Sequence, residues 1–406
     1  MNFRKLTSLD LAKEFVRVRK LTINTFKQFE RKLGPTLEVK MCPTINNPRW
    51  EFCHVAWFSE RWILRNKERN EGDSANLNTI LNPDENIKTY FKDADKLFDS
   101  SSIAHSDRWT IELPMELEII KYLEDTLSKI ILQIEREKPL TNNECYFYRL
   151  SLAHEYMHLE AFIMTARNLG FSIFNCHKKI LNTDFFKSKK VIIKEKKLNK
   201  RNLNLEFLFD NETIQLNLNT KPFEIDTSPV SVGSFIRFYE NNGYSNKLLW
   251  SKEGWNWLLR NKNNTFINLC TYDENRKFIL NKWFGLDHLV DSNFPALHIS
   301  FFEAQAYCNW KKRRLPTELE WMLATKKKEF EWGYVWEWTN DTFMSYKEFR
   351  PHPYEDYSKP WFNDHQVVKG TSFATQKKFK CIRFRNFYQK HRNDVFVGFR
   401  TVKDLL

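Results

Sequence analysis

The sequence is most informative in the stretch Leu150-Ser151-Leu152-Ala153-His154-Glu155-Tyr156-Met157-His158-Leu159. Its two histidines are four residues apart, and residues at this spacing share one face of an α-helix. The leucines and alanines around them have the spacing of a helix that packs in a core. Two imidazoles on one helix face can chelate a single metal ion. The stretch therefore predicts a buried helix that carries part of a metal site.

The same residues also match the zinc-hydrolase pattern H-E-x-x-H, in which Glu155 would activate a water molecule. The longer form of that pattern needs a glycine and a third histidine further on, where this chain has Ala161 and Met164. A zinc hydrolase is thus one alternative. A pair of ordinary core histidines is another.

A third ligand is suggested by His54, which lies in the aromatic segment 47–58. Pro48 suits the first turn of a helix, and we expect this helix to continue to Arg65. A histidine among aromatic residues is commonly a core residue, but here it can face the other two from a neighbouring helix. Three neutral imidazoles suit zinc, copper, iron or nickel, so the ligands do not select the metal.

Length and composition indicate a globular protein of two domains. The chain has 406 residues, of which 42% are hydrophobic. No stretch of about 20 apolar residues could span a membrane, and the first residues lack the apolar core of a signal peptide. We therefore expect a cytoplasmic protein. The seven cysteines form no C-x-x-C pair, so neither a disulfide framework nor a zinc ribbon is indicated.

The net charge of +13 raises the question of a nucleic-acid or membrane partner. The basic residues are spread along the chain, with one notable cluster from Lys187 to Arg201 and no recognised nucleic-acid module. We interpret this cluster as a solvated connector, and we expect neither nucleic acid nor membrane as a partner.

Residues 1–170 have the pattern of a helical bundle, and residues 171–220 that of a connector with short strands at Val191–Ile193 and Ile214–Leu218. The polar segment Phe98–Trp109 has the composition of a functional loop. Apolar residues recur at helical spacing in four segments: Leu9–Leu33, Trp50–Arg65, Met115–Glu137 and Asn143–Leu169.

Residues 221–406 predict short segments with little regular structure. Two helices are expected there, one from Phe302 to Trp310 and one capped by Thr317, with Glu320 completing a capping box. The predicted fold class is α+β.

This second half resembles the formylglycine-generating-enzyme, or sulfatase-modifying-factor, domain, which has a C-type-lectin-like fold. Five segments carry the resemblance in family order: 223–232, 314–321, 335–339, 368–373 and 398–400. The generator of formylglycine uses a copper-binding cysteine pair near its C-terminus, but residues 384–393 contain no cysteine. The resemblance therefore implies the fold without that chemistry.

The first half resembles the DinB-like four-helix bundle with a three-histidine metal site. Together the halves resemble the non-haem iron sulfoxide synthases of ergothioneine biosynthesis (EgtB type). The resemblance implies Fe(II) held by His54, His154 and His158. It also implies a reaction in which O2 is used to join a sulfur or selenium donor to the imidazole ring of hercynine (trimethylhistidine).

In that family a catalytic tyrosine supplies a proton or hydrogen atom, and it corresponds best to Tyr354, with Tyr357 as the competitor. An aromatic anchor in a loop is the alternative role for Tyr354. A trimethylammonium group favours aromatic faces, and the resemblance suggests Trp336, Trp338, Phe387 and Tyr388 as walls of the substrate site.

Departures from the family pattern bear on the donor. The branch that uses γ-glutamylcysteine has two arginines in the loop after the first histidine, where this chain has His105 and Arg108. Met157 replaces a glutamine of that branch, and no aspartate follows Phe387 in the motif that would hold the donor's amino group. These features are closer to the selenoneine synthase (SenA) branch, which implies a different donor.

Three rival classes remain from the sequence. They are a non-catalytic metal-binding module with the same folds, the zinc hydrolase, and a thiol transferase of the DinB type. The oligomeric state is not readable from the sequence.

Overall fold

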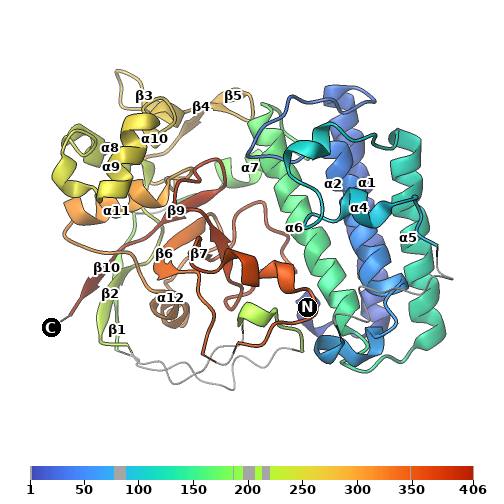
Figure 1. The fold of residues 1–406 in the computed structure, drawn as a ribbon. Coiled ribbons are helices and arrows are strands. Elements are labelled where there is room, and N and C mark those ends of the chain that lie inside the picture. Colours follow the sequence, from blue (N-terminus) through green and yellow to red (C-terminus); the bar gives the residue numbers. More distant parts are fainter. Residues whose placement is uncertain are drawn as a thin grey trace.

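The computed structural model describes residues 2–76, 88–185, 187–194, 206–212, 220–347 and 349–405. A helical N-terminal half and a mixed C-terminal half lie side by side (Figure 1). The expected strand Ile214–Leu218, and the part of the basic cluster from residue 195 to 201, lie outside the described residues. No helix in the described ranges is long and apolar enough to cross a bilayer.

The four predicted helices are present, and they form the bundle on the right of Figure 1. Helix α2 ends in a π-helical turn from Glu60 to Leu64, whereas the sequence predicted a regular helix to Arg65. Shorter helical elements at Phe3–Lys5, Arg69–Ser74, Ala94–Phe98 (α4) and Ser106–Trp109 surround the bundle. The four long helices are α1 (Ser8–Leu33), α2 (Pro48–Ser59), α5 (Glu116–Glu137) and α6 (Tyr146–Asn168).

Local sequence explains where α2 begins. The Asn47 side chain accepts hydrogen bonds from the backbone N–H groups of Arg49 and Trp50, and Pro48 occupies the first turn. Aromatic rings then fix α2 against its neighbours, since the Phe52 ring stacks on Phe162 of α6 at 4.1 Å between centroids. The ring of Phe26 in α1 packs edge-on against Phe52 at 5.0 Å.

The C-terminal half contains three small sheets. One has the order β1 (Lys190–Ile193), β2 (Phe223–Asp226) and β10 (Val402–Asp404), and all its pairs are antiparallel. The second is the meander β3 (Cys270–Tyr272), β4 (Phe278–Trp283) and β5 (Leu286–Val290). The third has the order β8 (Asn386–Tyr388), β7 (Gln366–Lys369), β6 (Trp336–Thr342) and β9 (Val397–Phe399), and β9 runs parallel to β6.

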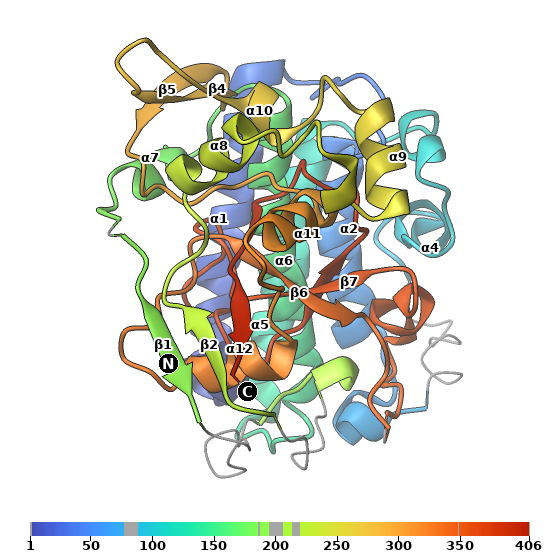
Figure 2. The same cartoon turned by 90° about the vertical axis from the view of Figure 1, so that its left-hand side faces the viewer.

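Short helices and turns connect these sheets, and Figure 2 shows α8 and α11 above the sheet that contains β1 and β2. Both predicted helices are confirmed, as α11 from Phe301 and as α12 with the expected capping box of Thr317 and Glu320. The α-helices of this half are α7 (Cys176–Leu181), α8 (Val232–Glu240), α9 (Lys252–Arg260), α10 (Phe266–Leu269), α11 (Phe301–Trp310) and α12 (Glu318–Ala324). Its single-turn 3-10 helices are Asp210–Glu212, Lys247–Leu249, Glu355–Tyr357 and Lys359–Trp361.

The two halves meet at a buried carboxylate, Glu160 of α6. Its oxygens accept hydrogen bonds from the Trp336 indole at 2.8 Å, the Ser372 hydroxyl at 2.5 Å and the Thr375 hydroxyl at 2.6 Å. Burial raises the pKa of Glu160, while the three hydrogen bonds act in the opposite direction. One side chain of the bundle thus holds strand β6 and the 372–375 turn of the other half.

We predict that Glu160→Ala destabilises the protein strongly, because it leaves three donors without their acceptor. Each buried donor that loses its partner costs about 1–3 kcal/mol, so the free energy of unfolding should fall by roughly 3 kcal/mol or more. Urea unfolding followed by tryptophan fluorescence measures this. Glu124→Ala, at an exposed position of α5, is the matched control, and an equal effect of both changes would contradict the prediction.

Candidate metal centre

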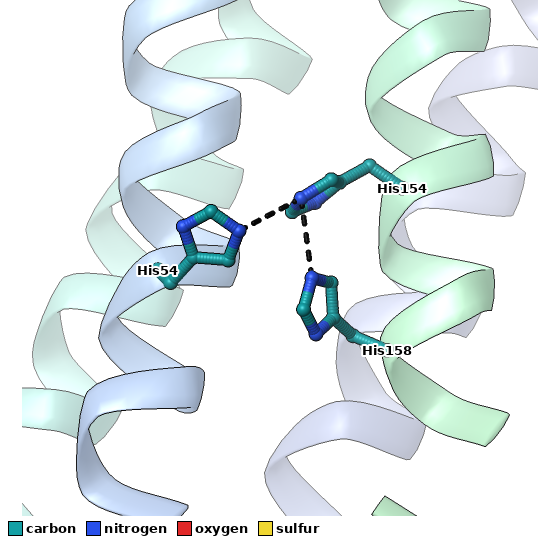
Figure 3. A group of neighbouring side chains, drawn as sticks. All are labelled: His54, His154 and His158. Atoms are coloured by element: carbon teal, nitrogen blue, oxygen red, sulfur yellow. Dashed lines mark hydrogen bonds between the residues drawn. The ribbon is translucent and has the colours of Figure 1, made fainter. Parts of the chain in front are cut away.

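Three imidazoles converge between α2 and α6 (Figure 3). The His54 and His154 Nε2 atoms are 3.0 Å apart, and those of His154 and His158 are 3.2 Å apart. One ring nitrogen from each residue lies within 4.8 Å of the others. His154 and His158 are one helical turn apart on α6, and His54 faces them from α2, as the sequence predicted.

The rings of His54 and His158 are each oriented by a hydrogen bond at Nδ1, the nitrogen that faces away from His154. His54 Nδ1 lies 2.7 Å from the Phe98 carbonyl oxygen, and His158 Nδ1 lies 2.7 Å from the Glu51 carboxylate. A carbonyl or carboxylate oxygen only accepts, so both Nδ1 atoms carry the proton and donate. A neutral imidazole protonated at Nδ1 has a lone pair on Nε2, and the Nε2 atoms of His54 and His158 both face His154.

The electrostatics of this cluster fit a cation. Burial, and then the neighbouring imidazoles, hold the pKa values of His54 and His154 well below the usual range, so these rings are neutral. A neutral His154 has one ring proton and can satisfy at most one of the two facing lone pairs. A metal ion at the convergence point would bind all three, as neutral imidazoles do in metal sites.

Aromatic rings hold the histidine rings in place. The Trp50 ring stacks on His54 with centroids 4.9 Å apart, and the Phe58 ring stacks on His154 at 3.7 Å. Arg108 lies over Trp50, with its guanidinium carbon 4.0 Å from the ring centroid. The rings therefore have little freedom to turn away from the convergence point.

Glu155 does not point toward the histidines. Its carboxylate pairs with Arg19 of α1 at 2.9 and 3.1 Å and accepts a hydrogen bond from Thr22 at 2.5 Å. Both partners are fully buried. The zinc-hydrolase alternative needs the Glu155 carboxylate beside a metal-bound water. The hydrogen bonds of this carboxylate to Arg19 and Thr22 of α1 contradict that alternative.

Tyr354 contacts Phe58, the same ring that stacks on His154. Its ring packs edge-on against Phe58 at 5.0 Å and against Trp62 at 5.6 Å. Burial raises its pKa, so the phenol keeps its proton near neutral pH. Tyr357 instead stacks on Phe209 of the connector at 4.2 Å.

A cavity of about 300 Å³ opens beside Glu51, between the two halves. The bundle contributes Asn46, Glu51, His105 and Thr165 to its wall. The C-terminal half contributes Tyr388, Arg392, Asp394 and Val395. The remaining wall residues come from the N-terminal half and are Pro43, Thr44, Ile45, Ala161 and Met164.

The predicted substrate residues divide into two groups. His105 and Tyr388 line this cavity. Arg108 lies next to it and donates a hydrogen bond at 2.6 Å to the side chain of Asn46, which is part of the wall. Met157 lies half-buried on α6 between the two histidine ligands, outside the cavity wall. Phe387 stacks on Phe343 at 4.0 Å instead of lining the cavity.

The two tryptophans suggested as walls have other partners. Trp338 is fully buried and donates its indole N–H to the Ile299 carbonyl at 2.7 Å, and the Trp336 indole is bound by Glu160. Neither lines the cavity, because both indoles are fixed in the packing of β6.

Sequence reasoning missed Glu51, Trp50 and the pair formed by Arg392 and Asp394. Arg392 donates to both oxygens of Asp394, at 2.5 and 2.6 Å, in the wall of the cavity. Glu51 is three residues before His54, but its partner is His158 on another helix, so no local spacing reveals it. A carboxylate bound to a ligand's second nitrogen is a common feature of metal sites.

Comparisons with known proteins agree with this architecture. The chain is homologous to hercynine oxygenases. It is 21% identical to the "Hercynine oxygenase" of Mycolicibacterium thermoresistibile over 98% of this chain and 95% of that protein. It is 26% identical to the "Hercynine oxygenase" of Mycobacterium tuberculosis over 48% of this chain, and this match spans only 56% of the relative's length.

The C-terminal half gives a second group of matches. The "Inactive C-alpha-formylglycine-generating enzyme 2" of Mus musculus is 28% identical over 30% of this chain and 44% of its own length. Residues 189–334 and 331–405 match the family model described as "Sulfatase-modifying factor enzyme 1-like domain". These residues make up more than half of the 406-residue chain. The chain therefore belongs to the family of proteins with a sulfatase-modifying factor enzyme 1-like domain.

Proposed function

We propose that this protein is an Fe(II)- and O2-dependent enzyme that joins a selenium or sulfur donor to the imidazole ring of hercynine. The observation that carries the proposal is the convergence of three imidazoles on one point, two of which burial keeps neutral by lowering the pKa of His54 and His154. Homology to a hercynine oxygenase over 98% of the chain supports the choice of substrate.

His54, His154 and His158 would hold the iron, which supplies the redox chemistry with O2 when it is bound. Three histidines without a carboxylate leave other coordination positions open for substrates. Glu51 and the Phe98 carbonyl keep two of the rings in the tautomer that a metal requires.

Tyr354 is the proposed proton or hydrogen donor. Its raised pKa keeps the phenolic hydrogen available. Contacts with Phe58 and Trp62 fix its ring, and Phe58 in turn stacks on His154. Tyr357 fits the role less well, because its ring stacks on Phe209.

The charges near the cavity favour a donor with fewer carboxylates than γ-glutamylcysteine has. Arg108 makes no ion pair with the described residues, and its guanidinium donates only to the Asn46 side chain and the Ser100 carbonyl. The His105 ring bonds to the Ile45 carbonyl, so it does not complete a second clamp. Arg392 is neutralised by Asp394. One available guanidinium suits a donor with at most one carboxylate, such as a selenosugar, as in selenoneine synthases.

Product analysis tests this function. The protein is reconstituted with Fe(II) without oxygen and then given O2, hercynine and a selenosugar, γ-glutamylcysteine or cysteine. We expect a coupled product of hercynine and the selenosugar in the mass spectrum. Coupling only with γ-glutamylcysteine would overturn the choice of donor. Absence of O2 consumption with every donor would favour a non-catalytic metal-binding module.

We predict that Tyr354→Phe changes the products more than it changes metal binding. Without the phenolic hydrogen, the rate of coupling should fall roughly 100-fold while oxidation of the donor itself continues. Iron content, measured by atomic emission, should stay near that of the unchanged protein. Tyr357→Phe is the matched control, and a change of products in that variant alone would assign the role to Tyr357.

A further inference from the structure

A large cavity lies in the C-terminal half on the side opposite the bundle. It is formed where α8, the end of α11 and the sheet of β1, β2 and β10 meet, and these elements lie far to the left of the helical half in Figure 1. Figure 2 looks directly onto this face. Its volume of about 830 Å³ would accommodate a ligand the size of a nucleotide.

The wall of this cavity carries mostly positive charge. Asp226 is the only carboxylate among the residues that line it, all of which are described. The wall contains seven cationic residues: Lys187, Lys190, Arg237, Lys311, Lys312, Arg313 and Lys403.

Most of these cations lie outside ion-pair distance of a carboxylate among the described residues. Arg313 pairs with Glu224 at 2.6 Å, and Lys190 lies 3.7 Å from the same carboxylate. The other five form no ion pair within the part of the chain that the structure describes. The Arg237 guanidinium, for example, donates to the neutral Ser234 hydroxyl at 3.1 Å.

Helix polarity explains only part of this cluster. Lys311 and Lys312 follow the C-terminal end of α11. A positive charge is favourable there because it lies near the free carbonyl groups of the helix end. Arg237, Lys187 and Lys403 belong to other segments, so the charge preference at the end of α11 does not explain their positions. Burial lowers the pKa of Lys311, and the like charges of Arg237 and Lys190 act in the same direction, while Asp226 acts in the opposite one.

The backbone conformation does not explain the lysine at residue 312. Lys312 has φ +54°, and the Arg313 N–H donates to the Cys308 carbonyl at 2.9 Å, so Lys312 occupies the helix-end position that glycine usually fills. A lysine in this left-handed conformation is strained relative to glycine.

We propose that this cavity binds an oligophosphate group, either free or as part of a nucleotide. Lysine and arginine form charge-assisted hydrogen bonds with phosphate oxygens, and the cavity wall adds the hydroxyls of Ser228, Ser231, Ser234 and Ser292. The charges come from separate segments and surround a hollow, which suits a small ligand better than a nucleic-acid strand. The site is separate from the histidine centre, so it does not depend on the proposed catalysis.

Calorimetric titration of the iron-loaded protein with inorganic triphosphate tests the proposal. The test variant is Lys311→Gln with Lys312→Gly, because glycine keeps the backbone conformation at residue 312. We expect saturable binding that weakens about tenfold or more in this variant and also weakens as salt is raised above about 0.15 M. Triphosphate should also protect Lys311 and Lys312 from acetylation, as read by mass spectrometry.

The matched control is Lys262→Gln with Lys277→Gln, which removes the same charge at exposed positions outside the cavity. Its affinity should stay within about twofold of the unchanged protein. ATP and triphosphate are compared to distinguish a nucleotide from a free oligophosphate. Absence of saturable binding of both, equal losses in the two variants, or binding only of RNA or of anionic vesicles would overturn the proposal.

Discussion

One buried carboxylate links the helix that carries His154 and His158 to the C-terminal half. Glu160 follows His158 by two residues, so α6 presents two histidines of the candidate metal centre toward α2 and an acceptor toward the C-terminal half. Three donors from β6 and the 372–375 turn satisfy this acceptor without a positive charge. The wall that carries Tyr388 is thereby held against the helix that carries two of the three converging imidazoles.

Three buried glutamates near the histidines have different roles because they have different partners. Glu155 is neutralised by Arg19 and joins α6 to α1, whereas Glu51 orients the ring of His158. Glu160 binds only neutral donors among its hydrogen-bond partners. The H-E-x-x-H pattern alone would assign the chemistry to Glu155. The structure shows that a tertiary ion pair, not the spacing, decides where that carboxylate points.

The sequence predicted features that depend on local spacing. Helical periodicity located the four long helices, the four-residue separation put His154 and His158 on one face, and a capping box marked the start of α12. Glu51 and Glu160 were missed because their partners are far away in sequence. Trp338 was suggested as a substrate wall from its residue type, but burial and the Ile299 carbonyl fix it in the core. Residue type indicates what a side chain can bind, while packing decides whether it is accessible.

The central claim is that the rings of residues 54, 154 and 158 bind one iron ion through Nε2. A crystal structure of the Fe(II)-loaded protein, grown without oxygen and recorded at the iron absorption edge, tests it most directly. The account predicts one anomalous peak about 2 Å from all three Nε2 atoms, with Glu155 still bound to Arg19. A peak that lacks one of the three rings, or that has Glu155 beside it, would contradict the account.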